Sequence, residues 1–185
     1  MADVAEALST AAAEVAAMAQ GGEADVLAMR TDVSDFAAVR ALKNATYDRF
    51  GEVAVLMNNA GVGRGGGAFD HIDGWRRVLG VNLWGVIHGV QAFAQAMIDQ
   101  KAPSAIINTG SKQGITNPPG DAAYNVAKAG VKTLTEHLAH QLRNIEGGCV
   151  TAHLLIPGFT FTGITQGVGR EKPSAAWTAD QVVDE

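Results

Sequence analysis

The sequence has one cysteine, few aromatic residues and no long apolar run, and these shortages exclude several classes of protein. The single cysteine, Cys149, has no partner for an internal disulfide and precedes an apolar stretch, so we expect a small, buried hydrophobic residue there. No stretch reaches about 18 uninterrupted apolar residues, which argues against a membrane span. Asp3 and Glu6 interrupt the start of the chain, which argues against a signal peptide. A reducing, cytoplasmic setting is therefore expected.

Basic charge and metal-binding patterns are also scarce. The net charge of −5 at pH 7 argues against nucleic acid or a membrane surface as a partner. The histidines show no metal-ligand spacing, so no metal is expected. What is present is a globular composition, 47% hydrophobic and 18% charged, in a chain of 185 residues. This is enough for one domain with a core.

Short apolar runs alternate with helical patterns along the chain. Strands are expected at residues 24–29, 54–57, 104–108 and 150–156. Helices are expected at residues 2–20, 34–50, 70–101 with a bend near Asn82, and 121–145, and another begins at 178–180. The alternation predicts βαβ units and therefore an α/β fold, with a doubly wound parallel sheet between two layers of helices.

Polar or glycine-containing motifs follow each predicted strand. They are Asp32-Val33, Asn59-Ala60-Gly61, Asn108 to Ser111, and Pro157-Gly158. Each alone is explained by the turn that must follow a strand. Because ligands of such folds bind outside the carboxyl ends of the strands, however, four motifs in this register predict one shared site.

The stretch from Ile106 to Gly130 carries the strongest chemical signal. Ser111 follows an apolar strand, a Pro-Pro-Gly break comes next, and Asp121 is a plausible N-cap for a helix. On that helix Tyr124 and Lys128 are four residues apart and share a face. A free phenol has a pKa of about 10, and a nearby cation lowers it. A buried Tyr and a solvated Lys on an ordinary helix explain that pair alone, but adding Ser111 favours a proton-transfer site.

The combination of N-x-G-S-x-x-G at residues 108–114 with Y-x-x-x-K at residues 124–128 resembles the short-chain dehydrogenase/reductase family. The resemblance implies a single Rossmann-like domain that binds NAD or NADP and transfers a hydride between the nicotinamide and a secondary alcohol or ketone. It implies a homodimer or homotetramer and a catalytic set of Ser111, Tyr124, Lys128 and Asn82. The residues it implies for cofactor binding are Asp32, Val33, Asn59, Ala60, Gly61, Tyr124, Lys128, Pro157, Gly158 and Thr162.

The resemblance also gives these residues roles. Tyr124 exchanges a proton with the substrate oxygen, which Ser111 positions. Lys128 lowers the pKa of Tyr124 and binds the nicotinamide ribose, and Asn82 holds a water in the proton relay. Asp32 and Val33 contact the adenine, and Thr162 meets the nicotinamide carboxamide.

The substrate side is less determined by the sequence. Lys112 and Gln113 face either the substrate or solvent. Residues 163–177 occupy the position of the family's substrate lid. Phe161 and Trp177 are expected to pack rather than to bind substrate, and Trp84 is expected in the core.

The chain departs from the family pattern at both ends. The glycine-rich turn T-G-x-x-x-G-x-G is missing, so we expect the first βαβ unit to be absent, together with the residue that selects NAD or NADP. The family's last strand is also missing, so residues 1–185 are expected to form a single partial domain. One interpretation is a fragment or a mis-called start of an enzyme. The alternative is a catalytically silent remnant that binds or forms oligomers. A nucleotide-sugar epimerase shares Y-x-x-x-K, but Asn59-Ala60-Gly61 and P-G-x-x-x-T argue against it.

Overall fold

The computed structural model describes residues 1–162, 164 and 171–184. Within them short strands alternate with helices, as the sequence predicts. In chain order the elements are β1 (Ala2–Asp3), α1 (Leu8–Met18), the 3₁₀ turn η1 (Gly22–Asp25), β2 (Met29–Arg30), α2 (Phe36–Phe50), β3 (Val55–Asn58), α3 (Ile72–Leu79), the π-helix η2 (Gly80–Trp84), α4 (Gly85–Asp99), β4 (Ser104–Thr109), α5 (Gln113–Thr116), α6 (Ala122–Arg143), β5 (Val150–Leu155) and α7 (Ala179–Val183).

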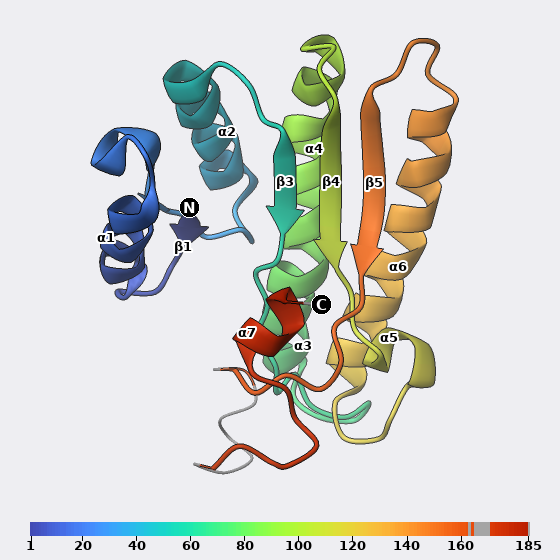
Figure 1. Ribbon diagram of the computed structural model, residues 1–185. Coiled ribbons are helices and arrows are strands. Elements are labelled where there is room, and N and C mark those ends of the chain that lie inside the picture. The colour runs from blue at the N-terminus through green and yellow to red at the C-terminus, as the bar shows by residue number, and fades with distance from the viewer. Residues whose placement is uncertain (163, 165–170, 185) are drawn as a thin grey trace.

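The described strands form two separate parallel sheets. One has three strands in the order β3-β4-β5, and the other pairs β1 with β2 (Figure 1). Residues 55–58 of β3 align with residues 105–108 of β4, which in turn align with residues 151–154 of β5. Figure 1 shows β1 standing apart from β3, on the side of β3 away from β4. The predicted parallel α/β architecture is confirmed, with its sheet in two parts.

The core lies where helices cover one face of the three-stranded sheet. Helix α4 packs on β3 and β4, α6 packs on β4 and β5, and α2 packs beside α4. Ile106 of β4 and Met97 of α4 have no exposed surface. Burial of such side chains stabilises the fold by about 1.5–3 kcal/mol each. The buried members of this cluster are Val39, Val53, Val90, Phe93, Met97, Ile106, Leu138, Leu142 and Val150.

Capping side chains explain where α2 and α6 begin. The Asp35 carboxylate accepts a hydrogen bond from the Ala37 amide at the start of α2, and Gly51 ends this helix in the left-handed conformation (φ 78°). The Asp121 carboxylate caps α6 in the same way by accepting from the Tyr124 amide. Both helix starts agree with the prediction from the sequence.

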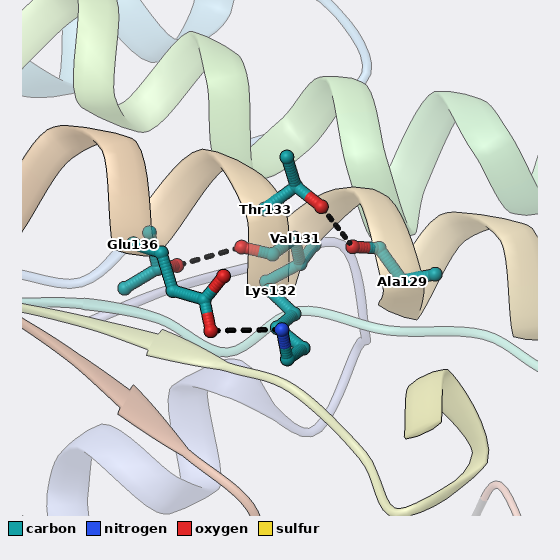
Figure 2. Close-up of polar contacts among 6 residues, drawn as sticks. Ala129, Val131, Lys132, Thr133 and Glu136 are labelled. Atoms are coloured by element: carbon teal, nitrogen blue, oxygen red, sulfur yellow. Dashed lines mark hydrogen bonds and ion pairs between the residues drawn. The ribbon is translucent and has the colours of Figure 1, made fainter. Parts of the chain in front are cut away.

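The outer side of α6 is held by contacts within the helix itself. Figure 2 shows the ion pair between Lys132 and Glu136, with a distance of 2.8 Å between Nζ and Oε1, and the Thr133 hydroxyl donating to the Ala129 carbonyl. An exposed pair spaced by four residues contributes only about 0.3–0.5 kcal/mol. The stability of α6 therefore comes from its buried face.

The first thirty residues differ from the prediction. The sequence predicts a helix from residue 2, but residues 2–3 form a strand and α1 begins only at Leu8. It also predicts a strand at residues 24–29, but η1 occupies residues 22–25 and only residues 29–30 pair. The apolar pattern of a strand is not readable over two residues, so hydrogen bonds to a neighbouring segment decide the structure here.

Three other expectations need correction. The bend expected near Asn82 is a π-helix at residues 80–84, which joins α3 to α4. Trp84, expected in the core, is 53% exposed, and its ring lies 5.9 Å from that of His88 on α4. Cys149, expected to be buried, is exposed because it lies in the turn before β5 rather than in the strand. The four-residue helix α5 has no counterpart in the prediction.

Every helix in the described part of the chain is too short or too polar to span a lipid bilayer.

Candidate active site

The predicted polar motifs follow the carboxyl ends of the strands. Residues 31–33 follow β2, residues 59–61 follow β3, residues 110–111 follow β4 and residues 157–158 follow β5. Because β3, β4 and β5 are parallel, the last three motifs lie at one edge of one sheet. Three of the four motifs predicted to form one site therefore lie together in the three-stranded sheet.

Asparagine side chains fasten this edge together. The Asn58 side-chain nitrogen donates to the Asn108 side-chain oxygen (2.8 Å), and the Asn108 side-chain nitrogen donates to the Thr135 hydroxyl of α6 (3.0 Å). The Thr109 hydroxyl donates to the Asn59 side chain (2.9 Å). A side chain at Gly89 would collide with the Asn58 amide, so glycine at this position keeps the chain of bonds in place. These satisfied polar groups fix the ends of β3 and β4 against α6.

Ser111, Tyr124 and Lys128 come together beside this fastened edge. The Lys128 side chain is almost fully buried, and its ammonium group donates to the Thr109 carbonyl (2.7 Å) at the end of β4. Lys128 Nζ lies 5.7 Å from the centre of the Tyr124 ring. The Ser111 side chain lies close enough to the Tyr124 phenol to lower its pKa. The three residue types predicted for proton transfer are thus neighbours.

A close contact between helices determines where Ser111 lies. Gly114 of α5 sits so near α6 that a side chain there would lie 2.6 Å from the Lys128 carbonyl carbon and 2.8 Å from the Ala129 nitrogen. The Gly114 amide also donates to the Ser111 carbonyl (3.0 Å). Glycine at residue 114 therefore lets the turn that carries Ser111 approach the helix that carries Tyr124.

The pKa directions differ from the expectation for Tyr124. Burial raises the pKa of Tyr124, the Ser111 hydrogen bond lowers it, and the charge of Asp121 raises it further. Burial also lowers the pKa of Lys128 from 10.5 to about 8. The sequence predicts that Lys128 lowers the pKa of Tyr124, but in the structure this pKa is raised. The Lys128 ammonium donates to the Thr109 carbonyl instead and is itself poorly solvated.

Asn82 binds the loop that follows β3. Its side-chain oxygen accepts from the Val62 amide and its side-chain nitrogen donates to the Val62 carbonyl, both at 2.7 Å. Asn82 is fully buried in the middle of the π-helix. Each end of the amide makes one hydrogen bond to Val62, which leaves one N–H and one oxygen lone pair of the side chain for a further partner such as a water.

A cavity of about 170 Å³ opens between the two sheets. Val33, Asn59 and Ala60, three of the residues predicted to bind the cofactor, line it. Asp3 at the end of β1 lines it as well, and the sequence does not predict this because a two-residue strand gives no pattern to read. The cavity therefore joins the carboxyl ends of β1 and β3 with the loop after β2.

The remaining residues predicted to bind the cofactor lie outside the lining of this cavity. Asp32 is exposed and accepts from the Ser34 amide and hydroxyl (2.9 and 2.7 Å), which lowers the pKa of Asp32. A side chain at Gly61 would begin 3.6 Å from a methyl group of Ile164. Gly158 is exposed, Pro157 and Thr162 are half-buried, and the expected lid residues 163 and 165–170 lie outside the described residues.

The substrate-side residues have clearer positions. Lys112 and Gln113 are exposed, and Trp177 is 45% exposed. The Trp177 carbonyl accepts from the Phe161 amide (2.8 Å), which ties the two aromatic residues together through the main chain. Among the described residues no group of three or more His, Cys, Asp or Glu side chains is arranged to hold a metal.

Parallel strands whose polar ends meet beside an opening are typical of a Rossmann-like oxidoreductase fold. A comparison with protein families matches residues 2–173 to the family described as short chain dehydrogenase. The chain belongs to this family.

Individual relatives agree with that assignment. The 3-oxoacyl-[acyl-carrier-protein] reductase of Synechocystis sp. is 37% identical over 166 residues, which cover 88% of this chain and 65% of the relative. Meso-2,3-butanediol dehydrogenase of Serratia marcescens is 33% identical, with 85% and 61% covered. The crystal structure of a short chain dehydrogenase/reductase from Burkholderia phymatum in complex with NAD is 44% identical, with a TM-score of 0.82 and 94% and 60% covered. The chain thus spans less than two thirds of the length of these relatives.

Proposed function

We propose that the protein is an NAD-dependent oxidoreductase that interconverts a secondary alcohol and a ketone. The observation that carries the proposal is the Ser111, Tyr124 and Lys128 cluster, with a buried ammonium beside a phenol at the carboxyl edge of a parallel sheet. The relatives include a butanediol dehydrogenase and a 3-oxoacyl reductase, whose names describe reactions at a hydroxyl or ketone carbon. Family resemblance further predicts a homodimer or homotetramer, and the single cysteine agrees with a reducing, cytoplasmic setting.

Each residue of the cluster has a separate task in this proposal. Tyr124 gives its phenolic proton to a ketone oxygen or accepts one from an alcohol. Ser111 hydrogen-bonds the same substrate oxygen and holds it near the phenol. Lys128, fixed by the Thr109 carbonyl, supplies positive charge beside the phenol and a donor for a ribose hydroxyl. The nicotinamide, when bound, accepts or donates the hydride.

The residues around the cavity fit the adenosine half of a dinucleotide. Val33 and Ala60 offer apolar walls to a purine, and Asp3 offers a carboxylate at the end of β1. A carboxylate in such a position hydrogen-bonds the 2′-hydroxyl of an NAD ribose and repels the phosphate of NADP. Asp3 therefore favours NAD, in line with the Burkholderia phymatum relative that binds NAD.

Titration with NADH and NADPH, followed by nicotinamide fluorescence, tests this assignment. We expect NADH to bind at least about tenfold more tightly, since a hydrogen bond to a charged group contributes about 1.5–3 kcal/mol. Asp3→Ala should reduce that preference to about threefold or less. Asp48→Ala, a change at an exposed residue of α2, should leave the preference intact.

Two results would contradict the proposal. Tighter binding of NADPH would rule out the role of Asp3 in selecting NAD. Absence of saturable binding by folded protein would favour the second candidate, a silent binding or oligomer-forming module. One observation supports this second candidate. Among the described strands none joins the β1-β2 pair to β3, so the two sheets that line the cavity are not hydrogen-bonded to each other.

A further inference from the structure

Asp121 is connected to more of the molecule than a helix cap requires. Besides the Tyr124 amide (3.2 Å), its carboxylate accepts from the Arg64 amide (2.8 Å) and the Gly65 amide (3.1 and 3.2 Å to its two oxygens). Arg64 and Gly65 lie 57 and 56 residues earlier in the sequence, in the loop between β3 and α3. One carboxylate therefore joins this loop to the first turn of the helix that carries Tyr124.

The loop fits tightly against that first turn. Gly65 is buried, and a side chain there would lie 2.5 Å from the Ala123 methyl group and 2.8 Å from a Val78 methyl group. The Ala123 amide also donates to the Gly66 carbonyl (3.4 Å). Arg64 has a left-handed backbone (φ 62°), which directs its amide toward the carboxylate. The loop thus approaches α6 only because residue 65 has no side chain.

The start of the same loop is held from the opposite side. Asn82 bonds both main-chain groups of Val62, and the Arg77 guanidinium donates to the Gly63 and Arg64 carbonyls (2.8 and 3.1 Å). A side chain at Gly63 would lie 3.2 Å from an Ile164 methyl group. The loop is therefore enclosed by three segments, which are the π-helix, the residues that follow β5, and helix α6. Asp121 connects the loop to α6.

We propose that Asp121 is a positioning residue for Tyr124, which fixes the first turn of α6 to the loop at residues 62–67 and so fixes the phenol relative to the end of β4. The inference rests on the proposed function, since it concerns the same proton-transfer site. It predicts that the Asp121 carboxylate controls both where the Tyr124 hydroxyl lies and how readily it releases its proton.

The charges around Tyr124 support an electrostatic effect of Asp121 in addition to the mechanical one. Asp121 raises the pKa of Tyr124, after burial and the Ser111 hydrogen bond in order of size. Lys128 on the same helix faces the ring at 5.7 Å. The neighbouring segments also carry charged or titratable side chains, all of them exposed: Arg64 and Asp70 of the loop, His71 before α3, Asp73, Arg76 and Arg77 of α3, Lys112 before α5, and His153 of β5.

The chain offers a direct measurement, because it contains only two tyrosines. In a Tyr47→Phe background the ultraviolet absorbance of phenolate reports Tyr124 alone, with circular dichroism at each pH to confirm folding. Asp121→Asn keeps a cap of similar strength but removes the charge, whereas Asp121→Ala removes both. Asp35→Ala is the matched control, since Asp35 caps α2 through the Ala37 amide at a site away from Tyr124.

We expect both Asp121 variants to shift the Tyr124 titration to lower pH and Asp35→Ala to leave it unchanged. Hydrogen exchange should then separate the two Asp121 variants. Asp121→Ala should expose the Arg64 and Gly65 amides to at least about tenfold faster exchange, whereas Asp121→Asn should preserve protection at Gly65 through its side-chain oxygen.

Turnover gives an additional test. Asp121→Ala should lower kcat by about tenfold or more with a smaller change in KM, because misplacing a catalytic group by about 1 Å costs up to about a hundredfold. Asp121→Asn should restore most of kcat but move the pH profile to lower pH. A helix cap with no positioning role would change stability without moving the pH profile.

Two outcomes overturn the inference. One is a Tyr124 titration that is the same in Asp121→Asn as in the parent, and the other is unchanged exchange at Arg64 and Gly65 in Asp121→Ala. Titration and exchange need neither cofactor nor substrate. A response in both, without turnover of any alcohol or ketone, would therefore contradict the proposed function while leaving the structural role of Asp121 in place.

Discussion

The three-stranded part of the molecule, from β3 to β5, and the N-terminal part, residues 1–30, differ sharply in how they are held together. The first has a buried core with Met97 and Ile106 at its centre and asparagine side chains that tie strand to strand. In the second, only Ala16 is buried, and Met18 is 80% exposed. The residues proposed for proton transfer lie in the part with the core, and Asp3, proposed to select the cofactor, lies in the part without one. The proposed chemistry and the proposed nucleotide selection thus belong to parts of the molecule that differ in how much apolar surface they bury.

The largest expected effect comes from removing the phenol of the three-stranded part. Tyr124→Phe should lower turnover by about 10²–10⁴-fold while leaving NADH binding within about threefold, because a general acid contributes to the chemical step rather than to cofactor binding. Tyr47→Phe is the matched control, since its hydroxyl bonds Gln100 at the end of α4 (3.0 Å). Steady-state rates and fluorescence titration measure both quantities. Retained turnover in Tyr124→Phe would show that Tyr124 is not the acid–base group and would contradict the proposed mechanism.

The second expected effect is on stability, and it compares a methionine in the three-stranded part with a methionine in the N-terminal part. Met97→Ala should lower the free energy of unfolding by about 2–5 kcal/mol, since it leaves a cavity in the core. Met18→Ala should change it by less than about 0.5 kcal/mol, because that side chain is 80% exposed. Urea unfolding followed by circular dichroism distinguishes them. Equal losses would show that the N-terminal part contributes to the same cooperative core.

The third effect is a pH dependence of stability that belongs to Lys128. Its pKa is about 8 in the folded protein against an ordinary value of 10.5, so between these values the unfolded chain holds the proton that the folded chain has released. Stability should therefore rise with pH from about 8 to about 10, by up to about 1.4 kcal/mol per pH unit. Below pH 8 the full cost of burying the charge is present.

Lys128→Met should remove that rise and stabilise the protein near neutral pH, offset in part by the lost bond to Thr109. The control is Lys132→Met on the same helix, whose side chain is 39% exposed and should keep the rise. Urea unfolding at several pH values measures the slope. If stability still rises with pH between about 8 and 10 in Lys128→Met, the rise belongs to another titratable group.

The sequence predicts the three-stranded part well and the N-terminal part poorly. The predicted bounds of β3 to β5 agree with the structure within about one residue, since each strand has four to six residues with a clear apolar pattern. The caps at Asp35 and Asp121 follow from residue type alone. Strands β1 and β2 have only two residues each, which is too short for any pattern to show.

The sequence predicts which residues form the candidate site, but it does not predict the contacts that these residues make. The spacing of Ser111, Tyr124 and Lys128 indicates that they meet, and the structure brings them together. The sequence does not show that the Lys128 ammonium points to a carbonyl or that burial dominates the pKa of Tyr124, because both depend on how α5 and α6 pack. The loop contacts of Asp121 join residues 56 and 57 positions apart, a distance that no local pattern reveals.

The outer edge of β3 has a consequence for how the protein behaves in solution. Among the described strands β3 pairs on one side only, and Val55 and Met57 are 57% and 49% exposed. A bare apolar edge is a template for strands from other molecules, and such pairing grows with concentration. Dilution, or an added extended peptide that occupies the edge, should therefore preserve monodisperse protein. The proposed active site and this unpaired edge belong to the same three-stranded sheet, so protein concentration should affect association and any measured turnover together.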